Sequence, residues 1–273
     1  MNRFTKVLVV IAALAMSLLL AVACSGGNQS GNQSDAQSDS GLNTVESGVL
    51  IMATSADFPP YEFWEGNEIV GIDAEIAAAI AEKLGLELRI TDMDFDSIIP
   101  AVVAGRADIG MAGMTITDER LESVYFSVSY ATGVQVIIVR EDSEITSADD
   151  LYAEDANFNI GVQTSTTGDL YSTWFLEDEG LATVHRYRRG TDAVQSLLTG
   201  RVDCVIIDNE PAKAFVAANP GLKILEQEFE IEDYAIAIRR GNTELKDAID
   251  NALRGLIADG TVQKIIDKYI TAD

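Results

Sequence analysis

The strongest constraint on the fold is an alternation of short β-rich runs with helical stretches, which begins at Val49. The expected strands lie at 49–53, 86–90 and 107–111, and the expected helices lie at 72–84 and 97–104. Gly85 follows the first helix in the position of a C′ glycine. Strands separated by helices need crossover connections, so the pattern predicts an α/β fold with mainly parallel sheets.

Two ten-residue segments, 100–109 and 195–204, are similar to each other. In each, an apolar helical run stops at a glycine, and an Arg-x-Asp sequence then leads into an apolar strand. The repeat predicts two lobes that contain the same helix–turn–strand unit. We expect the carboxylates of Asp108 and Asp203 to bind turn amides rather than a ligand.

Two extended apolar runs, 135–139 and 234–238, are the candidate crossovers between the lobes. As hinges, they predict a first lobe of residues 45–138 plus 235–273 and a second lobe of residues 139–234.

The start of the chain has the layout of a secretory signal peptide. Arg3 and Lys6 precede an apolar run that ends in Ala21-Val22-Ala23-Cys24. Small residues before a cysteine are similar to the lipobox of bacterial lipoproteins, although the position three before the cysteine is usually Leu. We therefore expect a signal peptide at 1–23 and a lipidated Cys24. An ordinary thiol beside a simple cleavage site is the alternative.

Residues 24–44 are expected to form a flexible tether, because the segment after the cysteine is rich in Ser, Gly, Asn, Gln and Asp and cannot bury apolar surface. The chain has 44 acidic and 19 basic residues, which argues against nucleic-acid binding. The other cysteine, Cys204, lies in an apolar run and is expected to be a buried, inert side chain.

Four motifs resemble the solute-binding proteins of family 3, the amino-acid-binding proteins of polar amino acid ABC transporters. They lie at 53–63, 70–73, 94–100 and 112–120. The resemblance implies a two-lobed fold of the periplasmic-binding-protein type II, with two hinge strands and a ligand cleft between the lobes. It also implies a free amino acid ligand, a permease partner in the membrane and no cofactor.

Arg120 is the candidate clamp for the ligand carboxylate. Thr117 is a good N-cap, which would place Arg120 in the first turn of a helix. A planar guanidinium grips a carboxylate at two points, which would offset an unfavourable placement in the helix dipole. The resemblance implies this role and implies that three neighbours assist: Ala112, Gly113 and Thr115. A surface arginine paired with Glu119 or Glu122 is the alternative.

Asp208 ends an apolar strand at the edge where open α/β sheets bind ligands. The resemblance implies that it binds the α-ammonium group, and a helix N-cap before Pro211 is the alternative. Thr166 and Thr167 precede a helix whose free N–H groups suit a carboxylate. The resemblance places both threonines against the ligand from the second lobe, with simple helix capping as the alternative.

The resemblance also implies that Phe58 and Phe95 flank the ligand side chain. Ser55 departs from the aspartate found in several members that bind cationic or amide ligands, which puts a basic ligand in doubt. The remaining candidates that could recognise the ligand side chain are Asp57, Glu62 and Gln163.

An enzyme related to cyclohexadienyl dehydratases is the alternative function, and it would need a general acid or base in the cleft. The only histidine, His185, lies outside the motifs, and no metal-ligand cluster is evident. We therefore expect a monomeric binding protein without catalytic or metal site. It would be anchored at the outer face of the cytoplasmic membrane or in the periplasm, and would close its lobes on the ligand.

Overall fold

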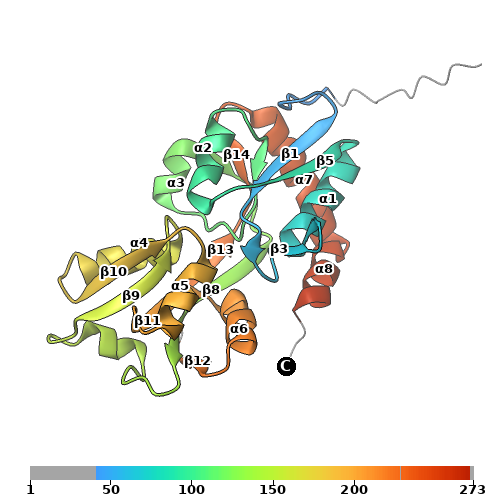
Figure 1. Cartoon of the computed structure of the whole chain (residues 1–273). Coiled ribbons are helices and arrows are strands. Elements are labelled where there is room, and N and C mark those ends of the chain that lie inside the picture. Colours follow the sequence, from blue (N-terminus) through green and yellow to red (C-terminus); the bar gives the residue numbers. More distant parts are fainter. Residues whose placement is uncertain (1–40, 228, 271–273) are drawn as a thin grey trace, which may run out of the picture. The chain divides into compact units, whose positions relative to one another are not determined.

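The computed structural model describes residues 41–227 and 229–270 of the chain (Figure 1). The predicted signal peptide, Cys24 and most of the predicted tether lie outside the described residues. Within the described part, no helix has the length and apolar character needed to cross a membrane.

The first lobe contains a five-stranded sheet in the order β5-β1-β6-β14-β7. β1 is parallel to β5 and β6, whereas β14 is antiparallel to its neighbours β6 and β7. These strands are β1 (Val49–Thr54), β5 (Glu87–Asp92), β6 (Ile109–Gly110), β7 (Val124–Phe126) and β14 (Ala237–Arg239). Every residue of β1 is buried, as expected for a strand covered on both faces.

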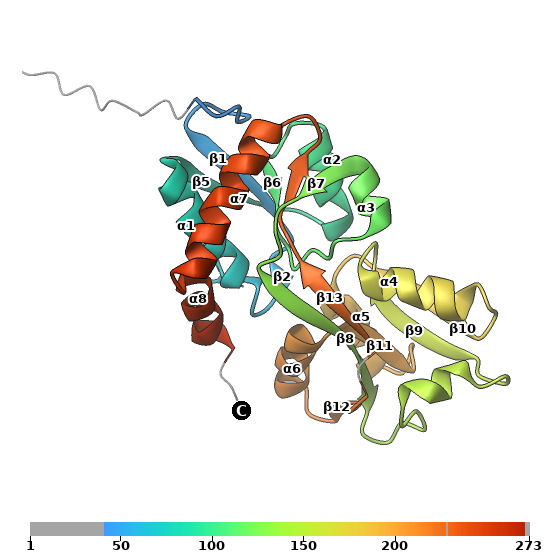
Figure 2. The same cartoon turned by 180° about the vertical axis from the view of Figure 1, so that it is seen from behind.

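Helices cover both faces of this sheet (Figures 1 and 2). The helices α1 (Ile72–Leu84), α7 (Thr243–Ala258) and α8 (Thr261–Tyr269) pack together on one face, and α2 (Ile98–Val103) and α3 (Asp118–Ser123) lie on the other. A short 3-10 turn, Phe95–Ser97, precedes α2. A small sheet of β2 (Asp57–Phe58), β3 (Glu62–Glu65) and β4 (Glu68–Val70) lies at the start of α1.

The second lobe contains a six-stranded sheet in the order β10-β9-β11-β8-β12, with β13 also paired to β8. The strands are β8 (Ala131–Arg140), β9 (Phe158–Gln163), β10 (Ala182–Tyr187), β11 (Cys204–Asp208), β12 (Leu222–Ile224) and β13 (Glu230–Tyr234). The helical elements are a 3-10 turn (Ala148–Tyr152), α4 (Thr167–Ser172), a π turn (Thr173–Glu177), α5 (Gly190–Leu198) and α6 (Asn209–Ala218). The prediction of an α/β fold with two lobes is confirmed.

The sequence repeat corresponds to the same unit in both lobes. After α2 and after α5 the chain turns at a glycine with positive φ, 67° at Gly105 and 72° at Gly200. Asp108 then accepts from the N–H of Ile51 at 2.8 Å, and Asp203 accepts from the N–H of Asn159 at 2.8 Å. Both carboxylates therefore tie a turn to the neighbouring parallel strand. A structural role was predicted for them, but the amides of Ile51 and Asn159 belong to β1 and β9 and not to turns.

The chain passes from the first sheet to the second between β7 and β8, and returns between β13 and β14. The return, at residues 235–236, lies within the predicted crossover 234–238. The other predicted crossover, 135–139, lies inside β8, which pairs along its length with β11, β12 and β13. The expected boundary at residue 138 thus falls within a strand of the second sheet, and the chain crosses earlier, at 127–130.

Candidate functional site

Residues from both lobes line one cavity. All eleven residues expected to contact the ligand lie in its wall, and Glu62 lies there with them. The first lobe contributes Ser55, Phe58, Glu62, Phe95, Ala112, Gly113, Thr115 and Arg120, and the second lobe contributes Gln163, Thr166, Thr167 and Asp208. The contact of each residue with a ligand stays a prediction.

Arg120 is the cationic group of this cavity. The Thr117 side chain accepts a hydrogen bond from the Arg120 N–H, so the predicted N-cap and first-turn placement are both present. The side chain is only 7% exposed, and it donates to the carbonyl of Thr115 at 2.7 Å and to the carbonyl of Ser165 at 2.9 Å. The alternative, in which Arg120 is a surface arginine paired with Glu119 or Glu122, is therefore wrong. These bonds leave further guanidinium N–H groups for a carboxylate.

Phe95 also contacts Arg120, whose guanidinium carbon lies 5.3 Å from the ring centroid. This aromatic face supports the cation of the first lobe as well as lining the cavity. Burial lowers the pKa of Arg120, while the nearby carboxylates of Glu232 and Asp208 raise it.

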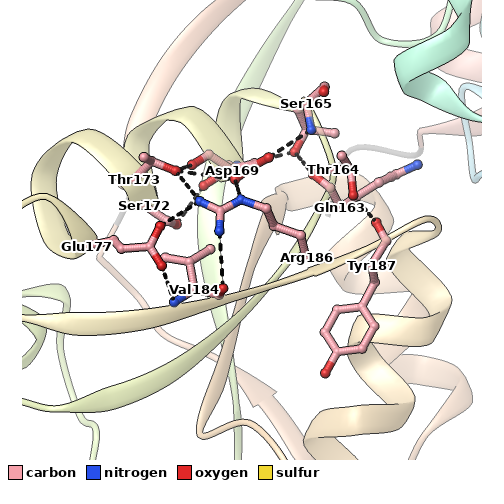
Figure 3. A network of polar contacts seen from close by, with 12 residues as sticks. Gln163, Thr164, Ser165, Asp169, Ser172, Thr173, Glu177, Val184, Arg186 and Tyr187 are labelled. Atoms are coloured by element: carbon pink, nitrogen blue, oxygen red, sulfur yellow. Dashed lines mark hydrogen bonds and ion pairs between the residues drawn. The ribbon is translucent and has the colours of Figure 1, made fainter.

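Ser165, which accepts from Arg120 across the cleft, has a left-handed backbone conformation with φ of 63°. A non-glycine residue in this region carries strain that the surroundings must support. Asp169 provides that support, because it accepts from the Ser165 N–H at 2.9 Å and from Nε of Arg186 at 2.8 Å (Figure 3). Arg186 also binds Glu177 at 2.7 Å, so a network of ion pairs and hydrogen bonds centred on the buried Asp169 holds the segment that precedes α4.

The two threonines at the start of α4 have different partners. The Thr166 hydroxyl donates to the carbonyl of Gln163 at 2.8 Å and accepts from the N–H of Asp169 at 3.4 Å, so it caps the helix. The Thr167 hydroxyl instead donates to Glu232 at 2.9 Å. Helix capping therefore describes the side chain of Thr166 but not that of Thr167.

Asp208 ends β11 and occupies the N-cap position of α6, but its side chain makes no capping hydrogen bond. It accepts a hydrogen bond from the hydroxyl of Tyr234 instead. Burial, followed by the charge of Glu232, raises the pKa of Asp208 to about 7, while the bonds from Tyr234 and Gln135 lower it. Asp208 thus stands at the N-cap position, but its carboxylate does not cap the helix as the alternative proposed.

Glu232 and Tyr234 were not anticipated from the sequence. They alternate along β13 with exposed residues, so both side chains point inward. Tyr234 also packs edge-on against Tyr61, with centroids 5.2 Å apart. The sequence places Tyr234 in a predicted crossover and gives no signal for Glu232, because its apolar neighbour Ile231 is the exposed residue of the pair.

The cavity wall also contains a buried acid, Glu62. Glu62 is fully buried, and no N–H or hydroxyl among the described residues donates to either of its oxygens. Burial, followed by the adjacent carboxylate of Asp73, raises the pKa of Glu62 well above its ordinary value. Asp73 in turn accepts from the N–H of Gly113 and the hydroxyl of Tyr130, both at 2.9 Å.

The remaining side-chain candidates differ in position. Gln163 lines the cavity and donates to the carbonyl of Arg188 at 3.3 Å. Asp57 is absent from the cavity wall; it accepts from the Ser55 hydroxyl at 3.1 Å and lies 3.9 Å from Arg189. The structure therefore favours Glu62 and Gln163 over Asp57 as groups that face a ligand side chain.

His185 and Cys204 lie away from the cavity. Nε2 of His185 is 2.9 Å from the side-chain oxygen of Asn159, and the Cys204 thiol is buried in β11, where burial raises its pKa. Among residues 41–227 and 229–270, no three Asp, Glu, His or Cys side chains gather as a metal site.

Comparisons with known proteins agree on the family. Residues 50–272 match the family model of the bacterial extracellular solute-binding proteins, family 3. The arginine-binding extracellular protein ArtP of Bacillus subtilis is 35% identical over 82% of this chain and 87% of its own length.

Two solved structures are similar over most of the chain. An ancestral arginine-binding protein bound to arginine is 39% identical, with a TM-score of 0.76, and covers 82% of this chain and 98% of its own. The ancestral amino-acid-binding protein AncCDT-1, a precursor of cyclohexadienyl dehydratase, is 32% identical, with a TM-score of 0.72 over 81% and 95%. These relatives are binding proteins and not enzymes, and they have the same two-lobed fold. The chain belongs to family 3 of the bacterial extracellular solute-binding proteins, as an amino-acid-binding protein of an ABC transporter.

Proposed function

We propose that this protein binds L-arginine between its lobes. The observation that carries the proposal is Glu62, a fully buried carboxyl group in the cavity wall to which no described N–H or hydroxyl donates. A buried carboxylate is costly unless it is paired, and a guanidinium offers two parallel N–H groups to it. The arginine-binding relatives support the same ligand.

The two poles of the amino acid have separate partners in this proposal. Arg120 binds the α-carboxylate, and Asp208 binds the α-ammonium. Phe58 lies beside Glu62 in the wall and offers an aromatic face to a flat cation. Ser55, Ala112, Gly113, Thr115, Phe95, Gln163, Thr166 and Thr167 complete the contacts.

The absence of the family aspartate at Ser55 still leaves an acid in the cavity wall. Glu62 lies in the same wall as Ser55, so a carboxylate is still available to a cationic side chain. Gln163 would serve an amide ligand equally well, which makes glutamine the comparison that tests the choice of arginine.

Delivery follows from contacts that span the cleft. The first lobe's Arg120 binds the carbonyl of Ser165 in the second lobe, so a ligand held by Arg120 is enclosed when the lobes approach. We propose that a membrane permease recognises this closed form and that a lipid on Cys24 keeps the monomer at the membrane. Residues 24–44 would act as the tether, outside the cytoplasmic membrane or in the periplasm.

The test is calorimetric titration of residues 42–273, after refolding to remove carried-over ligand, with each of the twenty amino acids. Arginine should bind tightest. Since arginine would ionise Glu62, its binding should release protons near neutral pH, seen as a dependence of the heat on buffer ionisation enthalpy.

A variant then links the ligand to the residue. Glu62→Gln should weaken arginine binding by about tenfold or more, because it removes one partner of a buried charge pair. Glutamine binding should change little. Glu65→Gln, at an exposed position on β3, is the matched control. Equal losses for both ligands, or a wild-type protein that prefers glutamine, would contradict the arginine assignment.

A further inference from the structure

Glu232 joins the ligand residues of the two lobes. It lies on β13, is 5% exposed, and does not itself line the cavity. Its Oε2 accepts from Thr115 of the first lobe at 2.9 Å and from Thr167 of the second lobe at 2.9 Å. Nε2 of Gln135 on β8 donates to the same oxygen at 3.1 Å.

The direction of these hydrogen bonds decides what the threonines can offer a ligand. An ionised carboxylate only accepts, and a threonine hydroxyl has one hydrogen to donate. Since both hydroxyl hydrogens point toward Glu232, Thr115 and Thr167 are left with lone pairs, although one on Thr167 already accepts from Gln135 at 3.3 Å. Two threonines in the cavity wall are thus acceptors there and not donors.

Acceptors suit one pole of an amino acid. A carboxylate needs donors, which Arg120 supplies, whereas an ammonium brings three N–H groups and needs acceptors. Thr115 lines the same cavity as Asp208, the acid already assigned to the ammonium. A hydroxyl that cannot turn its hydrogen toward the cavity therefore favours the ammonium and disfavours a carboxylate.

Charge acts in the same direction. The negative charges of Glu232 and Asp208 both raise the pKa of Arg120, so two buried acids share one buried cation. Oε1 of Glu232 is buried, with no hydrogen-bond partner among the described residues. An additional positive group near these acids lowers the electrostatic energy of the closed site.

We propose that Glu232 is a positioning residue for the ammonium pole of the ligand, because it accepts the hydroxyl hydrogens of Thr115 and Thr167 and leaves their oxygens to the ammonium. The inference rests on the proposed function only in requiring a ligand with an α-ammonium group. It is independent of the ligand side chain, which Glu62 is proposed to recognise.

The experiment compares two ligands that differ only in the α-amino group. L-arginine and 5-guanidinopentanoate are titrated into wild type and Glu232→Gln, an isosteric change that keeps the volume of the buried side chain. The variant should lose about tenfold in affinity for L-arginine and less than about threefold for 5-guanidinopentanoate. Glu230→Gln, at the exposed first position of the same strand, should change neither.

A second variant tests the route through the hydroxyl. Thr115→Val should also lose more affinity for L-arginine than for 5-guanidinopentanoate. The double variant Thr115→Val/Glu232→Gln should lose little more affinity than either single variant, because the two changes remove the same interaction. Additive losses would contradict action through Thr115.

The outcomes separate this inference from the arginine proposal. Equal losses for both ligands, or no loss, overturn the role of Glu232. If wild type binds L-glutamine and not L-arginine, the arginine proposal fails, and L-glutamine with its deamino analogue 5-amino-5-oxopentanoate tests Glu232 in the same way. A wild-type protein that binds none of the twenty amino acids overturns both.

Discussion

The hydroxyl of Tyr234 donates a hydrogen bond to the carboxylate of Asp208, and both side chains are buried. Tyr234 ends β13, the strand that leads back to the first lobe, and Asp208 ends β11 in the second lobe's sheet. A residue beside the crossover thus supports the carboxylate proposed to bind the ligand ammonium. Gly133 makes room for this arrangement, because a Cβ there would lie 2.1 Å from the Tyr234 hydroxyl.

Tyr234→Phe should weaken amino acid binding at pH 7 by about three- to tenfold, because a hydrogen bond to a charged group is lost while the ring is kept. The Tyr234 bond lowers the pKa of Asp208, so its loss raises that pKa above about 7. Affinity should therefore recover in part at pH 8.5, as measured by calorimetry. Tyr152→Phe, at a side chain 45% exposed, is the control. A loss that is the same at both pH values would argue against an effect through Asp208.

The stability of the protein in the absence of added ligand should fall as pH rises from 5 to 8. Burial raises the pKa of Asp57 and Asp73 to about 6, and that of Asp208 to about 7. A carboxyl whose folded pKa is raised contributes stability that is lost as pH rises through that folded pKa. Exposed carboxyls with lowered pKa, such as Glu46 and Asp150, lose their contribution only in more acidic solution.

Urea unfolding at pH 5, 6, 7 and 8 measures this dependence. Asp208→Asn should flatten the upper part of the curve, near pH 7, because one titrating group is removed. A free energy of unfolding that rises steadily from pH 5 to 8 would show that the raised carboxyls do not control stability.

Arg120→Ala should weaken every amino acid ligand by at least about tenfold, because the group proposed for the common α-carboxylate is lost. Arg120→Lys should restore only part of the affinity, since an ammonium cannot make two parallel hydrogen bonds. Arg106→Ala, at an exposed turn, is the matched control, and titration of the amino acid panel is the measurement. Unchanged affinity would remove Arg120 from the site.

Two arginines of the second lobe form ion pairs with acids of the first. Arg188 pairs with Asp94, and Arg189 lies 3.6 Å from Asp92. Arg188 is 80% exposed, and exposed pairs contribute about 0–1 kcal/mol, so Arg188→Gln should change affinity by less than about fivefold. Arg189→Gln should act more strongly, because Arg189 also lowers the pKa of the largely buried Asp57.

Small-angle scattering checks this prediction through the population of open molecules. The double variant Arg188→Gln/Arg189→Gln should have a larger radius of gyration than wild type before ligand is added. At saturating ligand the two proteins should have the same radius of gyration. The difference should shrink in high salt, which screens the pairs in wild type. An identical radius for both proteins at low salt would show that these pairs do not hold the lobes together.

The sequence by itself determined the α/β class, the two lobes and most of the cavity. The repeated helix–glycine–Arg-x-Asp unit marked both lobes, because a turn with positive φ and a carboxylate for amides are needed wherever that unit occurs. Arg120 and Asp208 were identifiable because a zwitterion needs both charges and because local capping and strand patterns placed them. The motifs of the family resemblance identified the remaining cavity residues.

Only the tertiary structure decided which buried groups support those residues. Glu232 and Tyr234 each act on partners far along the chain, as in the bond from Tyr234 to Asp208 and that from Thr115 to Glu232. A strand's period of two tells which side chains point inward, but not what lies opposite. That choice depends on how two sheets pack and where the chain crosses between them, and packing is set by long-range contacts that no local pattern records.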